Sequence, residues 1–402
     1  MVEKEGAKDS MKKVRVGMIG SGFAAAFHMK SYKQVRGIDV QVIAVTSHNQ
    51  ENAVKFAAEH NIPQVYQSVE ELLANPDIDV VDLCVPNHQH ATLAIAAARS
   101  KKHIICEKPL TGFFEKPSQS NVSDEAYAVR ALQEVMKSSD DVFRAVGENE
   151  VKFMYAENWV YAPVISKAKR LLWESGGTIL DIRAEQSHSG SHAKASKRVE
   201  TSGGGSLLLL GAHPVAAAIH LKHEEGKRKY GVPIHVKSVS TELGFMRNNL
   251  DPWLVADWVD VETWASSILT FTDGTKAIVT ASFEVLGGVK NVVEIHTSNS
   301  VLKCNMNQND SLMTYAPDEN VFGNEFITEK LATKAGWNYA SIDDEWEKGY
   351  HHEIQDFMEC IVEDREPLSG LPLAREVVEV IYSSYLSAAS GSRIEVFSKI
   401  NS

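Results

Sequence analysis

VRVGMIGSGFAA, residues 14–25, is the stretch that decides the fold of the first part of this 402-residue chain. The apolar run 14–19 predicts a buried strand, and the G-x-G-x-x-A that follows predicts a tight turn into a helix. In such a turn Gly20 permits the bend, and Gly22 lets a pyrophosphate approach the backbone at the helix N-terminus. The stretch therefore predicts a dinucleotide site, and a tight turn without a ligand is the alternative.

Strands and helices alternate outward from this stretch. Further strands are expected at 40–46, 80–85 and 103–106, with helices at 50–60 and 90–100 between them. Alternation at this spacing implies right-handed crossovers and a doubly wound parallel sheet. Residues 1–150 are therefore predicted to form an α/β Rossmann domain, with 111–123 as a loop inserted near the cleft.

The pattern changes over residues 151–402. A helix is expected at 164–174, and alternating runs at 266–271, 277–283 and 292–297 are separated by Asp-Gly and Gly-Gly turns. Two closing helices are expected at 345–363 and 373–389. This half is predicted to be an α+β domain with a large, mostly antiparallel open sheet.

The composition limits the partners of the protein. A formal net charge of -12 provides no basic surface for nucleic acid or for an anionic membrane. The four cysteines are widely spaced, which suits free thiols in a reducing compartment. The first residues are charged and no window reaches the length of a spanning helix, so a cytoplasmic protein is expected.

The end of the second strand bears on the choice of cofactor. Ser47, His48 and Asn49 stand where an acidic residue often binds the adenosine ribose. Without that carboxylate, and without a neighbouring arginine for a 2′-phosphate, the choice between NAD and NADP stays open, with a slight preference for NAD.

Several motifs together resemble one enzyme family. VPNHQH at 85–90, KHIICEKP at 102–109, N-x-x-Y-x-P at 158–163 and GGG to His at 203–213 are similar to the Gfo/Idh/MocA oxidoreductases, which include glucose-fructose oxidoreductase and inositol dehydrogenases. The resemblance implies NAD(P)-dependent hydride transfer at a hydroxyl carbon of a sugar, glycoside or cyclitol. It also implies a homodimer or homotetramer formed through the open sheet.

Lys108 is the first catalytic candidate. The carboxyl ends of parallel strands are where ligands bind, so its ammonium is expected to face the cleft, where burial would depress its pKa and fit it to handle a hydroxyl proton. The resemblance places Asn87 and His90 at the nicotinamide ribose and the next helix start. The residues expected to bind cofactor are Gly20, Gly22, Phe23, Ala24, Ser47, His48, Asn49, Pro86, Asn87, His90, Glu107 and Lys108.

His213 is the second catalytic candidate. The resemblance implies an Asp four residues before this His, on the same face of one helix, but Leu209 occupies that position and Leu210 follows. His213 as a helix-packing residue is the alternative. The residues expected to contact substrate are Glu157, Asn158, Tyr161, Glu185, His188 and His213, with Trp253 and Trp258 as candidates for a pocket rim.

Other functions remain open at this level. His188 and His192 lack a third ligand at convincing spacing, so no metal is expected. The missing Asp and the extra polar groups also suit a redox-neutral glycosidase or lyase that oxidises C3 transiently. A cofactor-binding regulatory protein without catalysis is the third reading.

Overall fold

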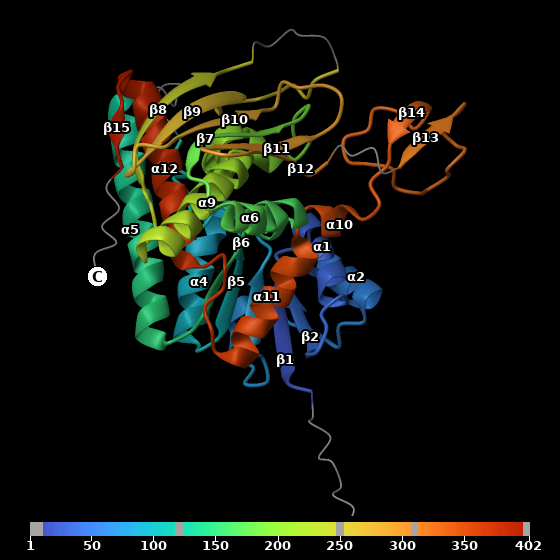
Figure 1. The fold of residues 1–402 in the computed structure, drawn as a ribbon. Coiled ribbons are helices and arrows are strands. Elements are labelled where there is room, and N and C mark those ends of the chain that lie inside the picture. The colour runs from blue at the N-terminus through green and yellow to red at the C-terminus, as the bar shows by residue number, and fades with distance from the viewer. Residues whose placement is uncertain (1–10, 117–123, 247–252, 308–311, 397–402) are drawn as a thin grey trace, which may run out of the picture.

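The computed structural model describes residues 11–116, 124–246, 253–307 and 312–396, which form two sheets with helices packed around them (Figure 1). The first sheet has six parallel strands in the order β3-β2-β1-β4-β5-β6. Its strands are β1 (Lys13–Ile19), β2 (Asp39–Thr46), β3 (Gln64–Val65), β4 (Val80–Leu83), β5 (His103–Glu107) and β6 (Phe153–Ala156). This is the predicted doubly wound Rossmann sheet, and the fold class is confirmed.

Helices connect the strands of the first sheet. They are α1 (Phe23–Tyr32), α2 (Gln50–His60), α3 (Val69–Leu73), the 3-10 helix η1 (Asn87–Gln89), α4 (His90–Arg99) and α5 (Glu125–Asn149). The boundary predicted at residue 150 falls before β6, which pairs with β5 and extends this sheet to Ala156. Part of the predicted 111–123 loop, residues 117–123, lies outside the described residues.

The second sheet has seven strands in the order β12-β11-β7-β10-β9-β8-β15. Its bounds are β7 (Ile179–Ser187), β8 (Val236–Gly244), β9 (Trp264–Phe271), β10 (Lys276–Ser282), β11 (Lys290–Thr297), β12 (Val301–Asn305) and β15 (Ile394–Glu395). β7 and β10 run parallel and the other neighbours are antiparallel, as predicted. A separate hairpin, β13 (Met313–Ala316) with β14 (Gly336–Tyr339), stands apart from the main body.

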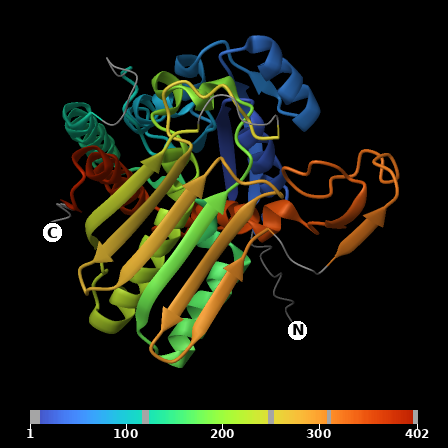
Figure 2. The same cartoon turned by 90° about the horizontal axis from the view of Figure 1, so that it is seen from above.

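Helices cover one face of the second sheet and leave the other uncovered (Figure 2). The helices of this segment are η2 (Asn158–Tyr161), α6 (Pro163–Ser175), η3 (Lys194–Lys197), α7 (Val199–Ser202), α8 (Ser206–Leu209) and α9 (Ala212–Tyr230). Of these, α6, α8 and α9 contact strands of the sheet. On the uncovered face Leu180, Ile268 and Ile278 are exposed, while alternate residues of the same strands are buried.

The chain returns to the first domain through α10 (Asp344–Glu347), α11 (Tyr350–Glu363) and α12 (Leu371–Ser390). α11 packs on α1, and α12 packs on α5 and β6 as well as on α9 and β8. The helix predicted over 345–363 is therefore two helices, interrupted at Gly349. This glycine has φ +97, and a Cβ there would lie 2.4 Å from the carbonyl oxygen of Asn158.

The remaining sequence predictions concern thiols and membrane spans. All four cysteines are buried and free, as predicted. Among the described helices none alone has the length and apolar character needed to cross a bilayer; the bent pair Val199–Leu209 and Ala212–Tyr230 meets that test jointly, on length and composition.

Candidate active site

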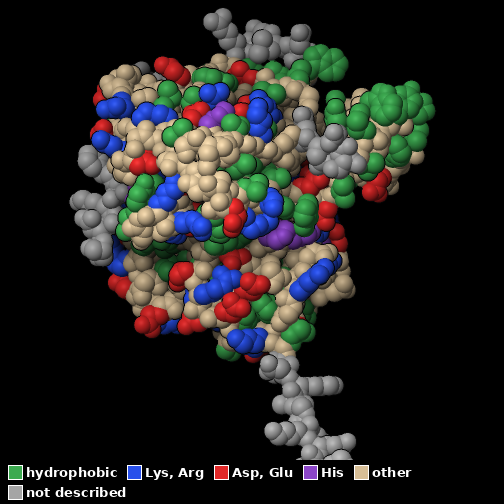
Figure 3. All heavy atoms as spheres, in the orientation of Figure 1, with side chains coloured by type: hydrophobic (Ala, Val, Ile, Leu, Met, Phe, Trp, Pro, Cys, Tyr) green, Lys and Arg blue, Asp and Glu red, His purple; other side chains and the backbone are tan. Residues whose placement is uncertain are grey.

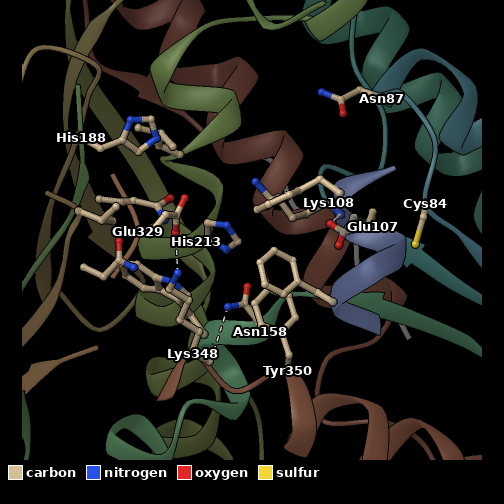
Figure 4. A pocket seen from close by; sticks show the side chains of 18 of the residues that line it. Cys84, Asn87, Glu107, Lys108, Asn158, His188, His213, Glu329, Lys348 and Tyr350 are labelled. Atoms are coloured by element: carbon tan, nitrogen blue, oxygen red, sulfur yellow. Dashed lines mark hydrogen bonds and ion pairs between the residues drawn. The ribbon is translucent and has the colours of Figure 1, made fainter. Parts of the chain in front are cut away.

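A cavity of about 320 Å³ lies between the carboxyl edge of the parallel sheet and the second sheet. Lys108 and His213 point into it from opposite domains (Figure 4). Its lining comprises Phe23, Ala24, Phe27, Cys84, Val85, Asn87, Glu107, Lys108, Asn158, Trp159, Gln186, His188, Leu210, His213, Val289, Asn291, Glu329, Lys348 and Tyr350. Both predicted catalytic residues thus share one site.

The glycine turn borders this cavity and is shaped to approach a ligand. Gly20 has φ +112, and a Cβ there would lie 2.1 Å from the carbonyl oxygen of Cys84, so no other residue fits. A Cβ at Gly22 would meet nothing within 4 Å, and no described side chain caps the start of α1. The first N–H groups of α1 and the open backbone at Gly22 fit a dinucleotide pyrophosphate.

Lys108 follows β5 and is held by the backbone of the other domain. Its Nζ donates to the carbonyl oxygen of Leu209 at 2.7 Å. Burial lowers the pKa of Lys108, although the carboxylates of Glu107, Glu157 and Glu329 act in the opposite direction. The ammonium is thereby prepared to exchange a proton more readily than a solvated lysine. The Lys108–Pro109 peptide bond is cis.

His213 is oriented by Glu157, the 2.6 Å pair joining its Nδ1 to the carboxylate Oε1. The carboxylate accepts, so Nδ1 carries the hydrogen and Nε2 keeps its lone pair on the cavity side. Trp159 stacks on the imidazole with the ring planes 15° apart. Burial lowers the pKa of His213, Glu157 raises it and Lys108 lowers it again, and the net lowering favours the neutral ring.

A buried network lies behind Glu107. The Nε2 of His28 is 3.3 Å from Glu107 Oε1, and its Nδ1 is 2.8 Å from Asp82 Oδ2. The hydroxyl of Tyr32 also donates to Asp82. Burial would raise the pKa of Glu107, but the hydrogen bond and charge of His28 dominate and lower it. Glu107 therefore stays ionised beside Lys108.

Sequence reasoning missed an ion pair in the cavity, formed by Lys348 and Glu329. Lys348 Nζ lies 2.6 Å from Glu329 and 2.7 Å from Asp344. Burial opposes the lysine's charge, yet the two carboxylates outweigh it and raise its pKa. The turn at Gly349 brings Lys348 and Tyr350 to the cavity, and a glycine inside the single helix predicted over 345–363 was the available sequence signal.

The segment before His213 differs from the expected single helix. α8 ends at Leu209 and α9 begins at Ala212, so residues 209 and 213 are not on one helix face. The break leaves the Leu209 carbonyl free of the helix and aimed at Lys108, while the side chain of Leu210 lines the cavity. Leu209, which lacks the carboxylate expected to contact substrate, therefore contributes its backbone carbonyl to the site.

Two predicted substrate residues do not reach the cavity. Tyr161 is buried, with its hydroxyl donating to Asp356 at 2.8 Å and accepting from the N–H of Ser369. Glu185 lies on β7, where it accepts from Ser187 and pairs with Lys290. Both predictions are corrected: packing and ion pairing occupy these side chains. The other four, Glu157, Asn158, His188 and His213, lie in or directly beneath the lining.

Some of the predicted cofactor residues lie at the cavity and others do not. Gly20, Gly22, Phe23, Ala24, Asn87, Glu107 and Lys108 line or border the cavity. His90 is fully buried, and its two ring nitrogens lie 2.6 Å from the carbonyl oxygen of Pro109 and 2.9 Å from that of Val85. His90 therefore braces the Glu107–Pro109 turn instead of meeting a ribose. Pro86 precedes η1.

Ser47, His48 and Asn49 follow β2, near the glycine turn, since Gly20 donates to the carbonyl oxygen of Thr46. Asn49 accepts from the N–H of Asn52 and thereby caps α2. No carboxylate stands among these three residues, so the choice between NAD and NADP stays open.

Two groups of side chains have the composition of metal ligands: His28, Asp82 and Cys84, which are buried, and His223, His235 and Glu376, which are partly buried. In both groups the side chains already bond one another directly at 2.8 Å. Because these bonds satisfy the same atoms that an ion would need, the expectation of no metal remains our prediction.

Comparison with known proteins defines the class. Residues 14–133 match the model described as an oxidoreductase family with an NAD-binding Rossmann fold. Residues 166–303 match the GFO/IDH/MocA C-terminal domain, and together the two matches cover more than half of the chain. The protein belongs to the GFO/IDH/MocA oxidoreductase family.

Two curated relatives align over most of the chain. Levoglucosan dehydrogenase of Pseudarthrobacter phenanthrenivorans is 26% identical over 330 residues, covering 77% of this chain and 78% of that protein. D-xylose 1-dehydrogenase (NADP(+)) 2 of Haloferax volcanii is 24% identical over 368 residues, covering 90% and 94%.

Solved structures share the fold over nearly the full length. The protein GenD2 from gentamicin A biosynthesis, in complex with NAD, has a TM-score of 0.78 at 20% identity, covering 99% of this chain and 100% of that one. Levoglucosan dehydrogenase in complex with NADH and L-sorbose has a TM-score of 0.73 at 22% identity, covering 96% and 100%.

Proposed function

We propose that the protein is an NAD(P)-dependent dehydrogenase that oxidises a hydroxyl-bearing carbon of a sugar, glycoside or cyclitol. The observation that carries this proposal is that Lys108 and a neutral His213 line one cavity next to the glycine turn. The dehydrogenase names of the two curated relatives support the same class. Bound NAD(P) supplies the acceptor for the hydride.

The residues of the chain manage the proton. Nε2 of His213 accepts the hydrogen of the reacting hydroxyl, and Glu157 stabilises the resulting imidazolium through Nδ1. Lys108 donates a hydrogen bond to the same oxygen and stabilises the negative charge that develops there. Both groups are fixed before substrate arrives, which avoids reorganisation during the reaction.

The cavity also suits a ligand rich in hydroxyl groups. The side chains of Gln186 and Asn291 both line the cavity. An amide can donate hydrogen bonds to hydroxyl groups and accept them, so these two residues suit such a ligand.

The alternative of a redox-neutral glycosidase has less support. It rests on Glu157, Tyr161, Glu185 and His188 as additional acids and bases, but Tyr161 and Glu185 do not reach the cavity. Burial lowers the pKa of His188 to about 4, so this ring is a poor general acid near neutral pH. The joint presence of Lys108 and His213 in one cavity favours an enzyme over a purely regulatory binding protein.

We further propose that the protein is cytoplasmic and that it forms a homo-oligomer, either a dimer or a tetramer. In this oligomer a second subunit covers the open face of the second sheet. The exposed Leu180, Ile268 and Ile278 support the oligomer, because burial of apolar side chains on a broad sheet face by a second subunit is favourable. Light scattering checks the mass, and a monomer in dilute solution would refute the oligomer.

The experiment for the function is reduction of NAD and NADP with a panel of methyl glycosides and cyclitols. We expect reduced cofactor in stoichiometric amounts from the wild type and almost none from Lys108→Met. His296→Asn, on β11 and away from the cavity, is the control that should retain turnover. Hydrolysis of a glycoside without net cofactor reduction would favour the redox-neutral alternative instead.

A further inference from the structure

A second cavity of about 610 Å³ adjoins the first and has no part in the proposed chemistry. It is bounded by the loop after β7, by the loop between β10 and β11, and by the segment that leads into β14. Its aromatic residues are Trp253, Trp337 and Tyr339.

The two cavities adjoin each other and share part of their lining. Val289 lines both of them. Residues adjacent in sequence face opposite sides, since His188 lines the first cavity and Ser189 the second, and Glu329 lines the first and Lys330 the second. A molecule seated beside Lys108 and His213 therefore has a direct neighbouring space into which it can extend.

One hydrogen bond joins the two linings. Nδ2 of Asn291, in the first cavity, donates to Oδ1 of Asn307, in the second. The bond holds the two linings together at their common border.

The lining of the second cavity suits a carbohydrate ring. Trp253 and Trp337 expose 73% and 70% of their surface, which is far more than packing tryptophans do, and Tyr339 is half exposed beside them. Flat aromatic faces bind the C–H face of a sugar, and the nearby amides of Asn307 and Asn338 suit its hydroxyls. Aromatic walls with a few polar groups are typical of ligand sites.

The charges of the lining disfavour a cationic ring. The described residues that line this cavity include no Asp or Glu, so an amino sugar finds no counter-ion there. The one lysine of the lining, Lys330, also repels a cationic ring, and its Nζ donates to the carbonyl oxygen of Gly190 at 3.1 Å.

We propose that this second cavity binds the ring attached to the one that is oxidised, so that the substrate is a glycoside with at least two rings whose second ring carries no amino group. This inference rests on the proposed function, because it extends the substrate held at Lys108 and His213. The hydride and proton steps are unchanged.

The test compares one-ring and two-ring substrates that carry the same reacting ring. We would assay methyl β-glucoside against cellobiose, methyl α-glucoside against maltose, methyl β-galactoside against lactose, and methyl β-xyloside against xylobiose. We expect at least one disaccharide to have a kcat/KM about tenfold above its methyl glycoside, which stacking on two aromatic rings can supply. Trp337→Ala and Trp253→Ala should each remove most of that advantage through KM, with the methyl glycoside unaffected.

Trp346→Ala is the matched control, since Trp346 is also a partly exposed tryptophan but lines neither cavity. It should leave both substrates unchanged. Equal kcat/KM for one-ring and two-ring substrates, or an equal loss for both in Trp337→Ala, would overturn the subsite. Absence of reduced cofactor with every sugar would count against the proposed function itself.

Discussion

Two buried histidine–carboxylate groups in the second domain have the same chemistry but different surroundings. Glu157 bonds the single ring of His213, and its Oε2 is buried without a described partner. Glu376 accepts from His223 and His235 through one oxygen and from the N–H of Val236 through the other. The first group lines the cavity and is incompletely satisfied; the second ties α12 to α9 and β8 and is complete.

The difference indicates how to separate a reactive pair from a structural one. A fully bonded carboxylate stabilises the fold, and here Glu376 keeps its charge, since the two histidines outweigh burial and lower its pKa to about 2. A pair with an unbonded oxygen and a ring nitrogen facing a cavity retains capacity for a ligand. Variants of His213 and Glu157 should therefore change activity, and variants of Glu376 and its histidine partners should change stability.

The largest effect is expected for His213→Asn. Loss of the general base should lower kcat/KM by roughly 10²–10⁴-fold. Steady-state reduction of cofactor measures the loss, and urea unfolding should give a midpoint close to that of the wild type. Wild-type turnover in this variant would show that the imidazole is a packing residue.

Glu376→Gln should act on stability. A pKa of about 2 in place of the ordinary 4.5 corresponds to about 3 kcal/mol of stabilisation near neutral pH. This stabilisation is present above pH 4.5 and disappears as the pH falls through about 2, because the folded pKa is the depressed one. Urea unfolding at pH 7 and pH 3 should show a larger loss for the variant at pH 7, with kcat unchanged. A fall in kcat without loss of stability would contradict the structural assignment.

Glu157→Gln should change the pH dependence of activity. Burial places the pKa of His213 below 6.5, so the acid limb of kcat/KM should lie below that pH in the wild type. Without the carboxylate the imidazolium loses its partner, so the limb should move to still lower pH and kcat should fall about tenfold. A wild-type limb above pH 7 would assign the base to another group.

The smallest effect is expected for His235→Gln. The hydrogen bond to Glu376 outweighs burial and raises the pKa of His235. Its charged form stabilises the fold fully below pH 6.5, and this stabilisation is lost as the pH rises through the raised folded value. The variant should therefore lose about 1 kcal/mol at pH 6 and much less at pH 9, measured by urea unfolding. An equal loss at both values would indicate packing alone.

Local patterns explain which parts of the fold were predictable. The glycine turn and the alternation of strands and helices are set by neighbours in sequence, so the Rossmann sheet followed from residues 14–106. The break of the helix at Gly349 could not be predicted from local patterns, because the carbonyl of Asn158, from a distant segment, approaches the backbone there. The same holds for the end of α8 before His213.

The candidate site was predictable in part for the same reason. Lys108 and His213 stand in recognisable motifs, whereas Lys348 and Glu329 stand in no such motif, and Gly349 indicated only a turn beside Lys348. Glu157 was expected to touch substrate, and the structure gives it His213 as a partner instead. Tyr161 was misassigned because only the folded chain reveals Asp356 beside it.

The backbone carbonyl oxygen of Leu209 accepts the hydrogen bond from Lys108. Every amino acid provides this oxygen, whatever its side chain. Position 209 is consequently open to engineering: a library randomised there and at the adjacent Leu210 would explore new ligand preferences while the ammonium remains tethered.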